Sequence, residues 1–132
     1  MIKIRRSVFE AIIAHAKKDV PIEACGYLAG KNGVITRQYL MKNTDNSPEH
    51  FSFDPEEQFK VMRSVRNEGL DLIANYHSHP ETPARPSRED IRLAFDPNIL
   101  YFIISLAQAN IDVKAFRINS STVEKAEIEV IE

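Results

Sequence analysis

The stretch Tyr76-His77-Ser78-His79-Pro80 predicts a central strand that ends in two histidines. The preceding residues, 70–76, are mostly apolar and predict a buried strand that runs into the motif. Residues i and i+2 of a strand point to the same face, so His77 and His79 project side by side while Ser78 faces the other way. Two imidazoles that converge from one face provide half of a site for zinc or another late first-row ion.

The stretch Arg85-Pro86-Ser87-Arg88-Glu89-Asp90 supplies the rest of such a site. Ser87 and Asp90 have the spacing of the N-cap and the third residue of a helix, which brings a hydroxyl and a carboxylate within one turn. If the loop of residues 80–86 folds back, Asp90 becomes a third metal ligand. Two histidines and one carboxylate leave the fourth tetrahedral position of zinc for water, which is typical of a catalytic site. Zinc lowers the pKa of that water to about 7.

These residues resemble the motif H-[ST]-H-P-x6-S-x2-D of the JAMM (MPN-plus) metalloprotease family. The upstream stretch Pro21-Ile22-Glu23-Ala24-Cys25-Gly26-Tyr27-Leu28-Ala29-Gly30 is similar to the family segment E-x-C-G-x-L-x-G, whose glutamate is the general base. The resemblance implies that Zn2+ is held by three side chains, those of His77, His79 and Asp90. It also implies that Glu23 activates the water and that the Ser87 hydroxyl helps to stabilise the oxyanion. Without the resemblance, nothing distinguishes Glu23 from the other glutamates.

The resemblance runs from about residue 7 to residue 117 and implies both a fold and a reaction. The fold is α/β (α+β), with a single curved mixed β-sheet flanked by two main helices and a short helix, as in JAMM/MPN and cytidine-deaminase-like proteins. The reaction is hydrolysis of the peptide or isopeptide bond after the C-terminal Gly-Gly tail of a ubiquitin-like or sulfur-carrier protein. The chain lacks the long insertions of larger members, which favours a minimal prokaryotic type. The alternative is a non-catalytic MPN-type scaffold, although such relatives have typically lost the metal ligands present here.

Length and composition set wider limits on the protein. A chain of 132 residues with 43% hydrophobic and 27% charged residues predicts one ordinary globular domain spanning residues 1–132. The net charge of -2 argues against a nucleic-acid partner. No apolar run approaches the roughly 18 residues of a membrane helix, and the N-terminus does not resemble a signal peptide. With one cysteine and no internal disulfide, a cytoplasmic protein is expected, and the sequence sets no oligomeric state.

Helix caps, turns and apolar periodicity predict the remaining elements. Ser7 and Glu10 suggest a capping box for a helix over residues 7–18. Asn32-Gly33 predicts a tight hairpin turn between strands at 24–29 and Val34–Met41. Asp54 and Pro55 predict the start of a second helix. Four further strands are expected, over residues 51–53, 99–106, 111–118 and 123–131, with the last as an exposed edge strand.

Several other interpretations compete with a zinc hydrolase. Cys25 is a candidate nucleophile, but free cysteine in an apolar segment is usually a small buried hydrophobe. His15, whose only helical metal partner is Asp19, and His50, a loop residue near the expected cleft, are given ordinary structural roles. Cupins and HUH nucleases also carry H-x-H motifs. The capped helices disfavour an all-β cupin, and the chain lacks both the apolar residue between the histidines and the DNA-binding charge of a HUH nuclease.

Overall fold

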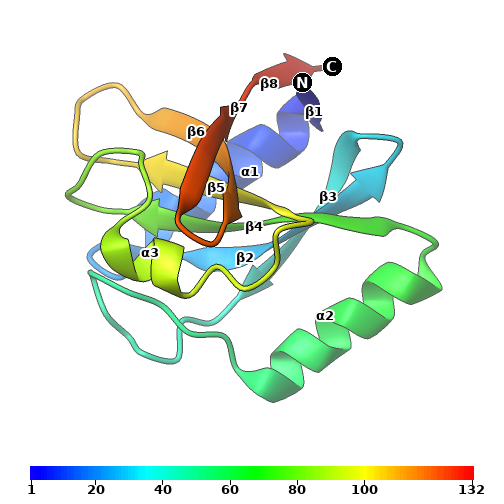
Figure 1. The fold of residues 1–132 in the computed structure, drawn as a ribbon, viewed down its shortest axis with the longest axis horizontal. Coiled ribbons are helices and arrows are strands. Elements are labelled where there is room, and N and C mark those ends of the chain that lie inside the picture. The colour runs from blue at the N-terminus through cyan, green and yellow to red at the C-terminus, as the bar shows by residue number, and fades with distance from the viewer.

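The computed structural model describes all 132 residues, and eight strands form one sheet in the order β7-β6-β5-β4-β2-β3-β1-β8 (Figure 1). The elements are, in chain order, β1 (Ile2–Arg5), α1 (Arg6–Asp19), β2 (Cys25–Lys31), β3 (Val34–Met41), α2 (Pro55–Asn67), β4 (Asp71–His79), α3 (Arg88–Arg92), β5 (Leu100–Ser105), β6 (Asp112–Asn119), β7 (Thr122–Ala126) and β8 (Ile128–Ile131). Pairing is parallel for β1/β3, β1/β8 and β4/β5 and antiparallel for the other neighbours. The predicted mixed sheet with two main helices and a short helix is therefore confirmed.

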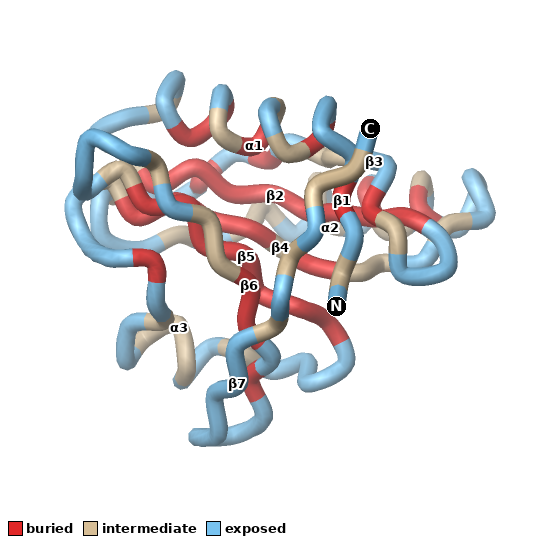
Figure 2. The backbone as a smooth tube through the Cα atoms, turned by 90° about the horizontal axis from the view of Figure 1, so that it is seen from above, coloured by how far each residue is buried: buried red, intermediate tan, exposed pale blue.

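The sheet buries a different core on each face. Helix α1 lies along one face, where its residues Ile12 and Ala16 belong to the same buried cluster as Tyr76 and Phe102 (Figure 2). Helix α2 covers part of the opposite face, where Val61 packs in a second cluster. Because side chains alternate along β4, the residues between those that face α1 point toward the α2 side of the sheet. This alternation places the two histidines on the opposite face from α1.

Two local predictions from the sequence are confirmed by backbone geometry. Asn32 and Gly33 both have positive φ, at 54° and 76°, as a type I′ hairpin turn requires, and they join β2 to β3. Asp54 caps α2 by accepting a hydrogen bond from the backbone N–H of Glu56, with Pro55 at the first helical turn. None of the helices combines the length and the apolar character that a membrane crossing requires.

Two predictions near these elements are wrong. Helix α1 begins at Arg6, directly after β1, so Ser7 lies inside the first turn and its predicted capping box does not form. Residues 51–53 do not form a strand. The aromatic residues of this segment pack as rings instead: Phe53 lies 4.7 Å from Tyr27, and Phe51 stacks at 4.8 Å on His77, both measured between ring centroids. Ring packing and individual hydrogen bonds, such as that from the Thr44 N–H to the Ser52 carbonyl oxygen at 3.0 Å, hold the segment in place without a strand ladder.

The predicted strand over residues 123–131 is two strands at opposite edges of the sheet. Strand β7 pairs antiparallel with β6, whereas β8 pairs parallel with β1 at the far edge. Ile128 and Val130 are partly buried against the core cluster on the α1 side, and β7 carries no buried residue. After Ala126 the chain therefore crosses from the β7 edge of the sheet to the β1 edge, because the last apolar residues are better buried beside β1.

Candidate metal centre

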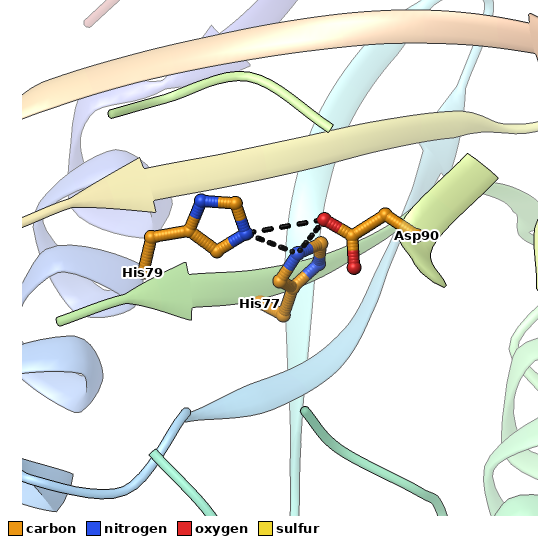
Figure 3. A group of neighbouring side chains, drawn as sticks. All are labelled: His77, His79 and Asp90. Atoms are coloured by element: carbon orange, nitrogen blue, oxygen red, sulfur yellow. Dashed lines mark hydrogen bonds and ion pairs between the residues drawn. The ribbon is translucent and has the colours of Figure 1, made fainter. Parts of the chain in front are cut away.

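The last residues of β4 carry the two histidines that the sequence singled out. His77 and His79 are almost fully buried, with 2% and 4% of their surface exposed. Their Nε2 atoms lie 3.1 Å apart, and each lies 3.1 Å from Oδ2 of Asp90, which comes from the first turn of α3 (Figure 3). The loop between β4 and α3 thus folds back as expected and brings together three side chains that could hold a metal ion and that span 14 residues of sequence.

The three ligand atoms have the separation that zinc requires. Ligand bonds of about 2.0–2.1 Å at tetrahedral angles place neighbouring ligand atoms about 3.3 Å apart, close to the observed triangle. Nδ1 of His79 lies 2.8 Å from the backbone carbonyl oxygen of Pro83, so Nδ1–H donates there and the neutral ring keeps its Nε2 lone pair for a metal. Two imidazole nitrogens and one carboxylate oxygen are a donor set that suits zinc. The residues present therefore fit the ion.

Asp90 is oriented by the helix start that the sequence predicts. The Ser87 backbone N–H donates to Oδ2 of Asp90 at 2.9 Å, and the Asp90 N–H donates to Oγ of Ser87 at 3.0 Å, which completes a reciprocal capping box. Burial alone raises the pKa of the Asp90 carboxyl. The hydrogen bonds from His77 and His79 outweigh that effect and hold the pKa well below its ordinary range. The carboxylate is therefore ionised and available as a ligand.

Glu23 lies just before β2, in the segment next to the end of β4. The residue is only 3% exposed, and its Oε1 is buried without a hydrogen-bond partner. Burial raises the pKa of this carboxyl to about 8, and the charges of His79 and Asp90 also act on it. A buried carboxyl group whose Oε1 has no protein partner, and on which the charges of His79 and Asp90 act, is suited to accept and release a proton.

Ser78 holds the Glu23 segment against the strand that carries the histidines. Its side chain points away from the ligand triad, as predicted, and its Oγ accepts a hydrogen bond of 2.7 Å from the N–H of Ala24. The N–H of Ser78 in turn donates to the carbonyl oxygen of Ala24 at 2.9 Å. The sequence motif did not assign a role to Ser78, because the partner segment lies more than fifty residues earlier in the chain.

A cavity of about 750 Å³ opens beside the ligand triad and includes His77 and Asp90 in its lining. One wall comes from the segment around Phe51 and from α2, and the other comes from the end of α3 and the residues that follow it. Asn75 and Tyr101 also contribute to the lining. The lining is largely apolar and aromatic, contains carboxylates, and includes no lysine or arginine. The site can therefore admit an extended, largely uncharged or basic segment.

The other candidate residues lie outside the triad. Cys25 is fully buried in the cluster on the α2 face, and burial raises the pKa of its thiol to about 12, so it is not a nucleophile in this setting. His15 is buried, with Nδ1 at 2.7 Å from the Tyr76 hydroxyl and Nε2 at 3.1 Å from Asp19. His50 is exposed, pairs with Asp45 at 2.9 Å and borders the cavity.

The mixed sheet, the strand that carries His77 and His79 and the helix start that carries Asp90 agree with the JAMM/MPN class that the sequence motif implied. Comparison with known families agrees with this class. The chain belongs to the family of prokaryotic homologs of the JAB domain, whose family model matches residues 5–119. The resemblance to the JAMM family noted from the sequence motif is thereby confirmed.

Two relatives that match much of the chain are a CysO-cysteine peptidase and a desampylase. The CysO-cysteine peptidase of Mycobacterium tuberculosis is 36% identical over 132 residues, which cover 98% of this chain and 90% of the relative. The desampylase of Haloferax volcanii is 33% identical over 103 residues, which cover 73% of this chain and 74% of the relative. These relatives support a hydrolase.

Solved structures give the same fold. The solution structure of a protein from Desulfitobacterium hafniense is 45% identical and superposes with a TM-score of 0.92, covering 100% of this chain and 94% of that chain. A JAB1/MPN domain protein from Archaeoglobus fulgidus, at 24% identity, superposes with a TM-score of 0.69 and covers 99% of this chain and 100% of that chain. The JAMM/MPN architecture is therefore confirmed.

Proposed function

We propose that the protein is a zinc-dependent peptidase or isopeptidase that cleaves the bond after the C-terminal Gly-Gly tail of a ubiquitin-like or sulfur-carrier protein. The observation that carries this proposal is the buried, unpaired carboxyl group of Glu23 beside a triad of zinc-type ligands. A scaffold that only binds partners gains nothing from such a group, since an unpaired buried polar atom lowers stability. A hydrolase uses it to move a proton.

In this proposal, the residues of the site have separate tasks. His77, His79 and Asp90 would hold zinc, which when bound would lower the pKa of a water molecule to about 7 and favour the ionised form of a nearby carboxyl group. Glu23 would take a proton from the attacking water as the water oxygen bonds to the substrate carbonyl carbon. Glu23 then gives the proton to the leaving amine nitrogen as the C–N bond breaks. One water is consumed, and a carboxylic acid and an amine are released.

Ser87 is proposed to act on the substrate carbonyl oxygen. Its Oγ accepts the hydrogen bond from the Asp90 N–H, which leaves the hydroxyl hydrogen free to donate. Ser87 is exposed, so a substrate can reach it. A donor aimed at the oxygen on which negative charge develops is worth about 10²–10³-fold in kcat in other hydrolases.

The relatives and the lining of the cavity support the proposed substrate class. The names of the relatives point to conjugates of small carrier proteins, as in the CysO-cysteine peptidase. A Gly-Gly tail would let the substrate backbone come close to the ligand triad, because glycine adds no side chain there. The apolar walls beside His77 would hold the residues upstream of the glycines. The carrier protein is the partner, and no nucleic acid is required.

The test pairs metal content with cleavage in wild type, Glu23→Gln and Asp90→Ala. The substrates are Gly-Gly-ended ubiquitin-like and sulfur-carrier proteins with a C-terminal extension. One zinc per chain in wild type and Glu23→Gln, with cleavage only in wild type, supports the proposal, and Asp90→Ala should lose zinc and activity together. Zinc without cleavage in wild type would favour the scaffold alternative, and cleavage by Glu23→Gln at the wild-type rate would exclude Glu23 as the base.

A further inference from the structure

Asn43, which follows β3, is a buried polar residue that the proposed chemistry does not use. Only 5% of its surface is exposed. Its side-chain N–H2 group donates to the backbone carbonyl oxygen of Glu23 at 3.1 Å and to that of His50 at 3.0 Å, with a longer contact of 3.4 Å to the carbonyl oxygen of Ser47. One amide group thus joins the segment of the proposed base to a loop that lies 20 or more residues further along the chain.

The carbonyl half of the same side chain shapes that loop. Oδ1 of Asn43 accepts hydrogen bonds from the backbone N–H groups of Asp45 at 3.0 Å and Ser52 at 3.3 Å. Between these residues the loop carries His50 and Phe51, which line the cavity, and the Phe51 ring stacks on His77. The bonds to Oδ1 therefore fix the cavity wall that touches a metal ligand.

The backbone of Glu23 is held from two sides. On the loop side, the Glu23 N–H donates to the carbonyl oxygen of Ser47 at 2.9 Å, and the Glu23 carbonyl oxygen accepts from Asn43. On the sheet side, the next N–H, that of Ala24, is bonded to Ser78. The sheet therefore holds the backbone only from the Ala24 N–H onward, whereas the loop holds the N–H and the carbonyl oxygen of Glu23 itself.

We propose that Asn43 is a positioning residue that holds the general base Glu23 and the cavity wall around Phe51 in a single arrangement. The effect on catalysis rests on the function proposed above. The structural coupling, by which Asn43 ties the Glu23 backbone to the loop around Phe51, does not. The primary amide of Asn43 can make both sets of hydrogen bonds, because it offers two N–H donors on one side and an acceptor oxygen on the other. The orientation of the amide is fixed by its neighbours, since the reverse orientation would place Oδ1 against backbone carbonyl oxygens.

The coupling can be measured by NMR hydrogen exchange in Asn43→Ala, with Thr44→Val as the matched control. Thr44 is exposed, and its hydroxyl donates to the Ser52 carbonyl oxygen at 3.1 Å without contacting Glu23. We expect the amides of both Glu23 and Ser52 to exchange at least about tenfold faster in Asn43→Ala, as when a buried hydrogen-bond partner is lost. In Thr44→Val only the loop should respond. Faster exchange confined to Ser52 in Asn43→Ala would overturn the proposal.

Two further measurements cover the case in which Asn43→Ala does not fold. Asn43→Asp keeps the acceptor for the loop and loses the donors, so the Glu23 amide should respond more than the Ser52 amide. In wild type under mild denaturant, Glu23 and Ser52 should exchange through one opening with the same denaturant dependence, while Ser78 should differ from both. Independent openings of Glu23 and Ser52 would contradict the coupling without any variant.

Steady-state kinetics on the carrier substrates test the catalytic part. Asn43→Ala should retain one zinc per chain. Its kcat should fall about tenfold or more because the base Glu23 is misplaced, and its KM should rise because the cavity wall around Phe51 is displaced. Thr44→Val should change KM alone. A normal kcat in a folded Asn43→Ala variant with faster Glu23 exchange would remove the catalytic part of the proposal. Absence of cleavage by wild type would instead count against the proposed function and leave the exchange result to decide the coupling.

Discussion

Glu23 combines two properties that oppose each other, because the buried carboxyl group that suits proton transfer also weakens the fold. Oε1 lacks a hydrogen-bond partner, and burial raises the pKa of the group to about 8. Functional groups in enzymes are often held in such unfavourable surroundings. We therefore expect that removing the Glu23 carboxyl group would raise stability and lower activity.

In the metal-free protein, the raised pKa of Glu23 makes the unfolding free energy fall as the pH rises. The folded-state pKa is raised, so the contribution of Glu23 to stability is fully present below its ordinary pKa of 4.5 and is lost as the pH rises through about 8. The loss should be on the order of a few kcal/mol in unfolding free energy. Urea unfolding of metal-free wild type and Glu23→Gln between pH 5 and pH 9 measures it. Equal pH slopes in the two proteins would contradict the prediction.

Cys25 should be dispensable for turnover. Its thiol is fully buried, and its pKa of about 12 leaves almost no thiolate near neutral pH. Cys25→Ser and Cys25→Ala should retain zinc and kcat, with some loss of stability because the site is packed. Cleavage assays on both variants check this. A folded, zinc-loaded but inactive Cys25→Ala would restore the thiol as a nucleophile.

Among single residues, the sequence predicts the proposed metal ligands better than it predicts the residues that surround and position them. The spacing of His77, His79 and Asp90 follows strand and helix-cap geometry, which local sequence encodes. Glu23 could be identified only by family resemblance, because its burial depends on distant segments. Asn43 and the stacking of Phe51 on His77 could not be identified at all, since their partners are backbone groups and rings that only the tertiary structure brings near.

At the scale of elements, the short helix α3 depends on its cap. A five-residue helix has little stability of its own, and the reciprocal bonds between Ser87 and Asp90 define its start. Those bonds also orient Oδ2 of Asp90, the proposed ligand atom. The cap therefore links the formation of a secondary-structure element directly to the shape of the candidate metal site.

Ser87→Ala should separate the capping role of the hydroxyl from its proposed catalytic role. Loss of the cap is expected to cost about 1 kcal/mol in unfolding free energy. Loss of the oxyanion donor is expected to lower kcat by about 10²-fold or more. Chemical denaturation and kinetics at saturating zinc measure the two effects, and Ser87→Thr should restore both in part. A loss of stability with unchanged kcat would leave Ser87 as a cap only.

Elements with local signals were predicted well, and those defined by long-range pairing were not. The turn at Asn32-Gly33 and the start of α2 at Asp54 carry their own turn and cap residues. The division of residues 123–131 into β7 and β8 has no such local signal. It depends on the burial of Ile128 and Val130 beside β1, more than a hundred residues earlier in the chain.

At the scale of the whole molecule, zinc should stabilise the fold, because it would join β4 to α3 across the intervening loop. A ligand that binds only the folded state stabilises it by about 2.7 kcal/mol at a hundredfold excess over its Kd. Chelation should therefore lower the melting temperature of wild type, and zinc should restore it. Asp90→Ala should show no shift with either treatment. An equal shift in both proteins would place the stabilising metal elsewhere.

The pairing of β1 with β8 gives the molecule a mechanical property. The two strands run parallel in four-residue register, from Ile2 opposite Ile128 to Arg5 opposite Ile131. A force that pulls Ile2 and Ile131 apart therefore acts along the strands and loads the hydrogen bonds between them in shear, all at once. Bonds loaded together resist extension far better than bonds that are peeled apart one after another. The fold should thus withstand tension applied through its two ends, while tension across the sheet would open it more readily.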